Sequence, residues 1–233
     1  MQALLNIQQQ TIEAVKKAAV FIQSEIGKVN NNEIETKSLN SLVTYVDKNA
    51  EMILVDALKD IIPNATFLTE ENTIAQTKGE WQWIIDPLDG TTNFIHQVPV
   101  FAISVGLQYN DEMVVGVVYE LNRNECFYAS KNNGAFLNGH LITVSKTTLL
   151  ADSLIATGFP YYDYDLLEYY INVFKKLMTS TRGMRRLGSA AIDLCFTACG
   201  RFDAFFEYSL SPWDVAAGAL ILKEAGGEIY DFS

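Results

Sequence analysis

A short stretch of the chain combines the side chains that metal and phosphate chemistry needs. Asp86 and Asp89 lie three positions apart, and Gly90 and the pair Thr91-Thr92 follow directly. Glycine admits close approach to the backbone, and paired carboxylates beside free amides suit a hard cation together with a phosphate. A tight turn would use the same residue types, because Asp and Gly are common in turns. The spacing alone leaves both interpretations open.

The elements around this stretch are expected to place both carboxylates at the end of a strand. The apolar residues 81–85 predict a short buried strand. Pro87 lacks an amide hydrogen and restricts the residue before it, so we expect the strand to stop at Asp86. We expect a short helix to begin at Thr91 or Thr92, with its free amides facing the same space.

The whole string Asp-Pro-Leu-Asp-Gly-Thr-Thr-Asn-Phe at 86–94 resembles the signature of the inositol monophosphatase family. That family belongs to the lithium-sensitive, magnesium-dependent phosphatases. Thr69-Glu70-Glu71 resembles a second motif of the family, and residues 213–218, followed by 224–227, resemble a third. The motifs stand in the family's order and at about its spacing, so the resemblance covers essentially the whole chain.

The resemblance implies a set of site residues and a cofactor, Mg²⁺. The metal ligands that it implies are Glu70, Asp86, Asp89, Asp214 and the backbone carbonyl of Leu88. The catalytic residues that it implies are Thr91, Asp47 and Glu70. The substrate-binding residues that it implies are Asp89, Gly90, Thr91, Gly188, Ser189, Ala190, Glu207 and Asp214.

The expected reaction is hydrolysis of a phosphate monoester by direct attack of metal-activated water. Two cations about 4 Å apart can hold the attacking and leaving oxygens of an in-line displacement. The hydroxyl of Thr91 would orient the water and relay to Asp47, while the amides of Gly90 and Thr91 would bind phosphate oxygens. No cysteine or histidine is placed for a phosphoenzyme route. By resemblance, lithium is expected to inhibit by occupying one magnesium position.

Three of these acidic residues also have structural explanations. Asp47 falls in the first turn of a predicted helix, where a negative charge suits the helix dipole. Asp214 lies near the start of another helix and would serve as an N-cap. Glu70 and Glu71 are adjacent, and neighbours in an extended segment point to opposite faces, so one of them at most serves the site. The resemblance selects Glu70.

Two further stretches bear on the substrate. Residues 182–186 form a basic cluster, Arg-Gly-Met-Arg-Arg, which invites a phosphate-binding role. Ion pairing with the protein's own carboxylates, or with a partner subunit, is the interpretation we prefer for it. Residues 158–165 are expected to help shape the substrate pocket.

Hydrophobic spacing and turn residues predict the remaining elements. The first half is expected to hold helices over 3–27 and 44–61 and strands, mainly antiparallel, over 66–70, 101–109, 113–119, 125–129 and 141–144. The second half is expected to hold strands over 154–156, 202–208 and 229–232 and helices over 166–178, 188–199 and 212–224.

The resemblance also implies an architecture. This is an α+β fold, a layered αβαβα sandwich of the inositol monophosphatase and fructose-1,6-bisphosphatase type, usually a homodimer. We expect one domain over 1–233, with an N-terminal half over 1–145 and a C-terminal half over 146–233. By comparison with the family pattern, the last strand and helix are expected to be missing.

Composition bounds the class of protein and its partners. The chain has 233 residues, of which 49% are hydrophobic and 19% charged, as in globular proteins with an ample core. A net charge of −11 argues against direct nucleic-acid binding, and bound divalent cations would reverse the sign locally for a phosphate. We expect a cytoplasmic protein without a membrane partner. The cysteines are sparse and form no CxxC, and the sequence shows neither a signal peptide nor an apolar run long enough to span a membrane.

Other functions fit the same motifs. The metal constellation also serves fructose-1,6-bisphosphatases and 3'-phosphoadenosine 5'-phosphate phosphatases. Residues 91–94 resemble the inositol monophosphatase form more than the nucleotide form, which favours a small polyol phosphate such as myo-inositol 1-phosphate. In a different class, the chain would be a non-catalytic regulatory binding protein with the same fold, as some bacterial relatives take part in RNA metabolism.

Overall fold

A large sheet organises the molecule. The computed structural model describes residues 2–38, 41–160 and 164–231, and within them this sheet has seven strands. In spatial order they are β3 (Thr66–Thr69), β4 (Trp81–Asp89), β5 (Ala102–Tyr109), β6 (Glu112–Glu120), β7 (Glu125–Ser130), β8 (Ala135–Leu137) and β9 (His140–Ile142). β3 runs parallel to β4 and the later pairs are antiparallel, which confirms the predicted antiparallel character.

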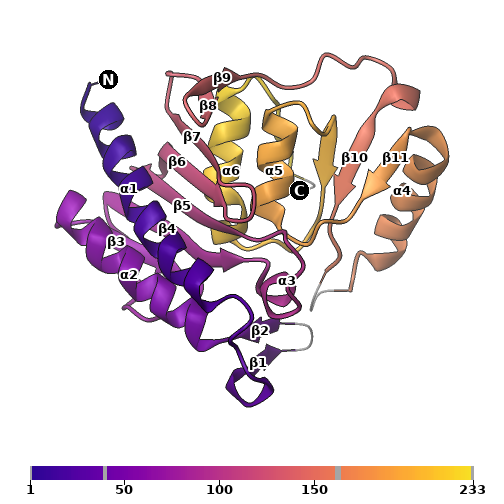
Figure 1. The fold of residues 1–233 in the computed structure, drawn as a ribbon. Helices are drawn as coiled ribbons and strands as arrows, with labels where there is room; N and C mark the ends of the chain where they lie inside the picture. The colour runs from indigo at the N-terminus through magenta and orange to yellow at the C-terminus, as the bar shows by residue number, and fades with distance from the viewer. Residues whose placement is uncertain (1, 39–40, 161–163, 232–233) are drawn as a thin grey trace.

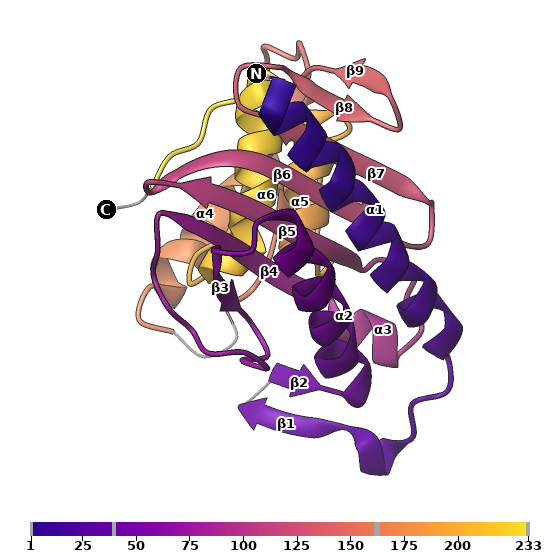
Figure 2. The same ribbon diagram turned by 90° about the vertical axis from the view of Figure 1, so that its left-hand side faces the viewer.

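Helices cover both faces of this sheet. α1 (Gln2–Glu25) and α2 (Tyr45–Ile61) pack on one face, as Figure 2 shows. α5 (Ala190–Ala198) and α6 (Pro212–Glu224) pack on the other (Figure 1). The sheet therefore has an apolar core on each side, one around Trp83 and the other around Phe127.

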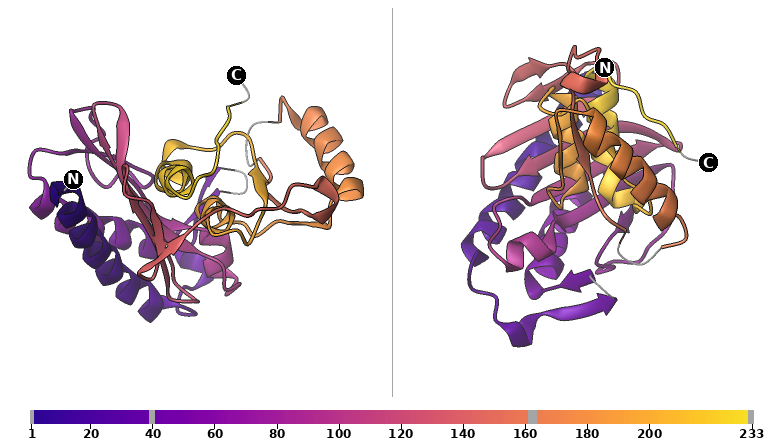
Figure 3. Two further views of the ribbon diagram at one scale, coloured as in Figure 1. Left: turned by 90° about the horizontal axis from the view of Figure 1, so that it is seen from above. Right: turned by 90° about the vertical axis from the view of Figure 1, so that its right-hand side faces the viewer.

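A second, smaller sheet lies beyond α5 and α6. Its strands are β11 (Gly183–Arg185), β10 (Leu154–Thr157) and β12 (Ala204–Phe206), all parallel, with β10 in the middle. α4 (Leu167–Ser180) packs on its outer side, so the layers follow the order α, β, α, β, α when seen from above (Figure 3, left). The predicted α+β layered sandwich is confirmed.

Short elements complete the described chain. They are η1 (Asn31–Glu33), β1 (Glu35–Ser38), β2 (Ser41–Val43), α3 (Thr91–Ile95) and η2 (Leu150–Asp152). β1, β2, β8 and β11 were not predicted; each has three or four residues, which display little of an alternating pattern, and none stands out as a long apolar run. Within the described ranges, the model has no helix with both the length and the apolarity needed to cross a bilayer.

The start of α2 follows from its sequence. The hydroxyl of Thr44 accepts a hydrogen bond from the Val46 amide, and the Asp47 carboxylate accepts one from the Thr44 amide at 2.8 Å. This reciprocal pair is a capping box, which satisfies amides that lack partners inside the helix. The predicted position of Asp47 in the first turn is confirmed, and its hydrogen bond to the Thr44 amide adds a capping role to the one predicted from the helix dipole.

The path of β4 differs from the prediction. The strand does not stop at Asp86 but continues to Asp89, after an irregularity in its pairing with β5. Between Asp86 and Asp89, β4 advances three residues while β5 advances two, from Ser104 to Ala102. Pro87 lies within this bulge, where a missing amide hydrogen leaves no ladder bond unmade.

Two strand predictions near turns need correction. The strand expected over 229–232 is absent from 229–231, which pair with none of the described strands. Ile229 and Tyr230 are exposed, so no apolar packing holds them against a sheet. Phe232 lies outside the described residues. The strand expected over 141–144 ends at Ile142. Beyond it the Val144 amide donates to the carbonyl of Ala225 instead of to a neighbouring strand.

Glycines in the large sheet let α6 lie against it. A Cβ atom on Gly116 of β6 would stand 2.7 Å from the carbonyl oxygen of Ala217, and one on Gly106 of β5 would stand 3.3 Å from the Cβ of Ala216. The helix backbone therefore rests almost directly on the strands. This close packing brings the start of α6, which carries Asp214, to the end of β4.

Candidate active site

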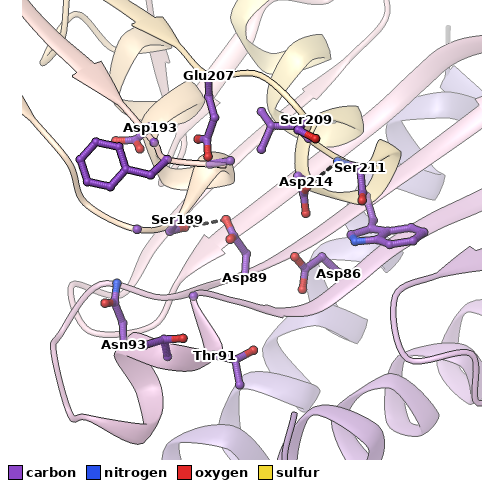
Figure 4. Close-up of a pocket in the computed structure, with 18 of the residues that line it drawn as sticks. Asp86, Asp89, Thr91, Asn93, Ser189, Asp193, Glu207, Ser209, Ser211 and Asp214 are labelled. Carbon is purple, nitrogen blue, oxygen red and sulfur yellow. Dashed lines mark hydrogen bonds between the residues drawn. The ribbon is translucent and has the colours of Figure 1, made fainter. Parts of the chain in front are cut away.

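A cleft of about 700 Å³ opens where the end of β4 meets the starts of α5 and α6 and the segment 207–211 (Figure 4). Its lining includes the predicted residues Glu70, Asp86, Leu88, Asp89, Gly90, Thr91, Gly188, Ser189, Ala190, Glu207 and Asp214. Asp47 lies behind the lining, bonded to Thr91. The structure thus brings together all the residues that the motifs singled out, from both halves of the chain.

Asp86 is a buried carboxylate at the floor of the cleft, 2% exposed. Its Oδ1 accepts a hydrogen bond from the Leu88 amide at 2.9 Å, across the turn that Pro87 creates. Burial raises the pKa of Asp86 well above its ordinary value, and repulsion by Glu70, Asp89 and Asp214 raises it further. A hydrogen bond with the Glu70 side chain raises the pKa of Asp86 as well.

Asp89 joins β4 to the start of α5. Its Oδ2 accepts hydrogen bonds from the hydroxyl of Ser189 at 2.6 Å and from the amide of Ala191 at 2.8 Å. Burial raises the pKa of Asp89 to about 6, although these donors oppose the shift. Ser189 is the N-cap of α5 and also accepts from the Ile192 amide, so its hydroxyl orients Asp89.

Asp214 enters the cleft from the first turn of α6. Its Oδ2 accepts from the amide of Ser211, the N-cap residue, at 2.6 Å. The prediction that Asp214 is the N-cap itself was wrong, because Ser211 occupies that position and Asp214, three residues later, completes a capping box with it. Asp214 lines the cleft as well. Burial raises its pKa to about 7, with repulsion by Asp89 as the next cause.

Glu207 follows β12 and points into the cleft opposite Asp89 (Figure 4). Burial raises the pKa of Glu207 to about 8, and repulsion by Asp89 and Asp214 adds to the shift. Gly158 lies against this carboxylate: a Cβ atom there would stand 1.9 Å from Oε2. Position 158 therefore accommodates Glu207 because it carries no side chain.

Thr91 and Asp47 form a buried pair at the edge of the cleft. The Thr91 hydroxyl lies 2.8 Å from Asp47 Oδ1 and 3.1 Å from the carbonyl oxygen of Leu88, as a donor to either. The other carboxylate oxygen of Asp47 accepts from the hydroxyl and the amide of Thr44. Burial raises the pKa of Asp47, although these hydrogen bonds oppose the shift. The capping box of α2 thereby orients the carboxylate that holds Thr91.

The donor set fits a divalent cation in its chemistry. The four carboxylates expected as ligands, Glu70, Asp86, Asp89 and Asp214, line one cleft. Mutual repulsion raises the pKa of Asp86, Asp89 and Asp214, and a cation would relieve it. Among the described residues, however, no three acidic, histidine or cysteine side chains already stand at ligand spacing.

Two cleft residues were missed as site residues in the sequence. Asp193 is 1% exposed and its Oδ1 has no hydrogen-bond partner in the part of the chain that the structure describes. It lies one turn beyond Ser189 on α5, and this helical spacing was the available signal. Arg186 also lines the cleft, with its guanidinium 5.4 Å from the centre of the Phe159 ring.

The basic cluster therefore divides between two roles. Arg182 pairs with Asp152 at 2.9 Å, which confirms the preferred ion-pair interpretation for that residue. For Arg186 that interpretation was incomplete, because its side chain belongs to the cleft wall. In the expected pocket segment 158–165, residues 158–160 line the cleft, and 161–163 lie outside the described residues.

Comparison with protein families identifies the family of the chain. The model of the inositol monophosphatase family matches residues 4–233. The chain belongs to this family. The resemblance drawn from residues 86–94 and the two accompanying motifs is confirmed, and the family and fold support a phosphatase.

The chain is similar to named relatives and solved structures over nearly its whole length. The Nus factor SuhB of Escherichia coli is 42% identical over 234 residues, which cover 100% of this chain and 86% of the relative. The structure of the extragenic suppressor protein suhB from Bartonella henselae has a TM-score of 0.90 and 36% identity, and covers 95% of this chain and 85% of that one. The inositol monophosphatase from Anabaena (Nostoc) sp. PCC 7120 has a TM-score of 0.85 and 37% identity, and covers 98% of this chain and 84% of that one.

Proposed function

We propose that this protein is a Mg²⁺-dependent phosphatase that hydrolyses a small polyol monophosphate, such as myo-inositol 1-phosphate, and is inhibited by lithium. The observation that carries the proposal is one cleft that gathers four carboxylates and the Thr91–Asp47 pair. Membership of the inositol monophosphatase family supports the reaction class.

The carboxylates of Glu70, Asp86, Asp89 and Asp214, with the carbonyl of Leu88, would hold Mg²⁺. When bound, Mg²⁺ supplies positive charge that polarises the phosphoryl group and lowers the pKa of water. The same charge offsets the repulsion that the carboxylates exert on an anionic substrate.

Thr91 and Asp47 would handle the proton of the attacking water. When the Thr91 hydroxyl donates to Asp47, its oxygen keeps lone pairs that accept a hydrogen bond from water in the cleft. That bond orients the water's own lone pair toward the phosphorus. As the new oxygen–phosphorus bond forms, the bond from phosphorus to the polyol oxygen breaks, the water's proton passes to Thr91 Oγ1 and the threonine proton passes to Asp47 Oδ1. The polyol oxygen leaves and takes a proton from solvent water, and Asp47 later returns its proton to solvent.

Other residues would bind the substrate. Gly90, at a φ of 93°, lets the phosphate approach the backbone, where the amides of Gly90 and Thr91 donate to it. Glu207 accepts hydrogen bonds from hydroxyls of the polyol. Ala190 and Gly188 leave room at the start of α5. The carboxylates of Glu207 and Asp193 on one wall favour a polyol with a single phosphate over a bisphosphate.

Phosphate release from a panel of substrates tests this function. Inositol 1-phosphate, glycerol 2-phosphate, fructose 1,6-bisphosphate and 3'-phosphoadenosine 5'-phosphate are each assayed with Mg²⁺, with and without lithium. We expect lithium-sensitive turnover of inositol 1-phosphate, lowered roughly 100-fold or more in Asp89→Asn. Preference for a bisphosphate would keep the mechanism and change the substrate. No turnover of any member by folded protein would contradict the proposal.

A second candidate is a regulatory binding protein with the same fold, which the names of the Nus factor relatives favour. It gains support if the folded protein turns over no phosphate ester. A homodimer and the lack of direct nucleic-acid contact remain predictions. Size-exclusion chromatography with light scattering tests the first, and titration with RNA at several salt concentrations tests the second.

A further inference from the structure

A charged residue that the reaction does not use lies buried beneath the cleft. Glu51, on α2, is 0% exposed, and no ion pair among the described residues involves it. Burying a carboxylate without a cation is costly unless several donors satisfy its oxygens. Its hydrogen-bond partners therefore indicate what the residue does.

All the partners of Glu51 come from the segment that leaves β3. Its Oε1 accepts from the Thr69 hydroxyl at 2.8 Å, from the Thr73 amide at 2.8 Å and from the Thr73 hydroxyl at 2.7 Å. Its Oε2 accepts from the Glu71 amide at 2.8 Å. One carboxylate thus gathers the residues on both sides of Glu70.

Glu70 itself is held from the other direction. Its amide donates to the carbonyl oxygen of Ile85 on β4, at 3.2 Å. Its side chain lines the cleft and hydrogen-bonds to Asp86. The Glu70 amide is bonded to β4, and the residues on both sides of Glu70 are bonded to Glu51. These bonds fix the backbone of the segment 69–73 and hold the Glu70 side chain toward the cleft.

We propose that Glu51 is a positioning residue that aims the Glu70 carboxylate into the cleft and thereby sets the affinity of the cleft for its divalent cation. This inference rests on the proposed function, because Glu70 matters here as a cation ligand. A purely structural role would use the same hydrogen bonds but would affect only stability.

The substitution Glu51→Gln separates the two roles. Glutamine replaces one of the two accepting carboxylate oxygens with an NH2 group that can only donate, so this group opposes an N–H or O–H donor of Thr73 or Glu71. In the metal-free protein we expect the amides of 71 and 73 to exchange hydrogen at least about tenfold faster. We expect the Mg²⁺ concentration for half-maximal phosphate release to rise about tenfold or more, with a smaller change in kcat at saturating Mg²⁺.

The control is Leu58→Ala, on the same helix and about 10 Å further along it. Leu58 is fully buried, so this variant loses stability without touching the segment 69–73. We expect it to lower the melting temperature while leaving the Mg²⁺ dependence within about twofold of wild type, as for sites that share no partners. Thr73→Val, which removes one hydroxyl donor, is a milder second variant and should shift both readouts in the same direction.

The positioning role is overturned if Glu51→Gln and Thr73→Val show the same hydrogen exchange and the same Mg²⁺ dependence as Leu58→Ala. That outcome would leave the proposed phosphatase function intact. Failure of the proposed function looks different. In that case wild-type protein neither releases phosphate nor melts at a higher temperature with Mg²⁺, even if Glu51→Gln still speeds exchange at 71 and 73.

Discussion

The Thr91 hydroxyl is the group whose removal most directly tests the proton path. Thr91→Val keeps the side-chain shape but removes the donor that bonds to Asp47 at 2.8 Å. We expect the rate of phosphate release at saturating Mg²⁺ to fall about 100-fold or more, as for loss of a general base, with little change in KM. The matched control is Thr179→Val, since the hydroxyl of Thr179 bonds only within exposed α4. Equal rates in the two variants would contradict the proton path.

Gly158 tests the substrate wall at the same scale. Because a Cβ there would overlap the carboxylate of Glu207, Gly158→Ala must displace that carboxylate or the strand that carries it. We expect KM for the polyol phosphate to rise about tenfold or more, the value of one lost hydrogen bond to a charged group. Glu207→Gln, assayed beside it, should raise KM in the same direction. An unchanged KM in Gly158→Ala would show that Glu207 does not contact the substrate.

At the scale of elements, the contact between α6 and the large sheet positions Asp214. Gly116→Ala places a methyl group 2.7 Å from the carbonyl oxygen of Ala217, which forces the helix and strand apart. We expect a loss of about 1–3 kcal/mol in the free energy of unfolding, typical of overpacking, together with reduced activity. Urea denaturation of wild type and variant measures the first effect.

The control for this element prediction is Gly183→Ala on β11. A Cβ atom at Gly183 would meet the flexible Arg185 side chain at 3.3 Å and no backbone atom within 4 Å. This variant should therefore stay within about 0.5 kcal/mol of wild type, as ordinary surface substitutions do. Similar losses in both variants would mean that a methyl group added to either sheet is destabilising, and that the close approach of α6 is not the cause.

At the scale of the whole molecule, the cleft makes metal-free stability depend on pH. Burial raises the pKa of Asp89 to about 6, of Asp214 to about 7 and of Glu207 to about 8. In the unfolded chain such groups titrate near 4, so between about pH 4 and pH 8 the folded state binds more protons. The free energy of unfolding should therefore fall as pH rises through this window.

Urea unfolding of metal-free protein from pH 5 to pH 8 measures this slope. We expect Glu207→Gln to reduce the fall near pH 8, because glutamine carries no proton to lose, and saturating Mg²⁺ to flatten the profile by compensating the carboxylates. Asp203, whose pKa is lowered in the folded protein, has the opposite effect. The stability that it contributes is lost as the pH falls, below this window. A free energy of unfolding that rises between pH 5 and pH 8 would contradict the prediction.

The local pattern of the sequence determined the long elements and the chemistry of the motifs. The apolar spacing over 44–61 and the turn residues around 110 and 122–124 marked a helix and hairpins that the structure contains. Such features depend on neighbours a few residues away, so a single chain displays them. The string at 86–94 likewise identified carboxylates, hydroxyls and glycine suited to a cation and a phosphate.

The tertiary structure alone decided which distant groups meet. Asp89 bonds to Ser189, Gly158 makes room for Glu207, and Glu51 holds the residues around Glu70. It also placed Asp193 and Arg186 in the cleft wall and carried β4 past Pro87 through a bulge. No local pattern encodes these contacts, because they join residues far apart in the chain, such as Asp89 and Ser189, that only the packing of one element against another brings together. The residue types came from the sequence, and packing brought them to one place.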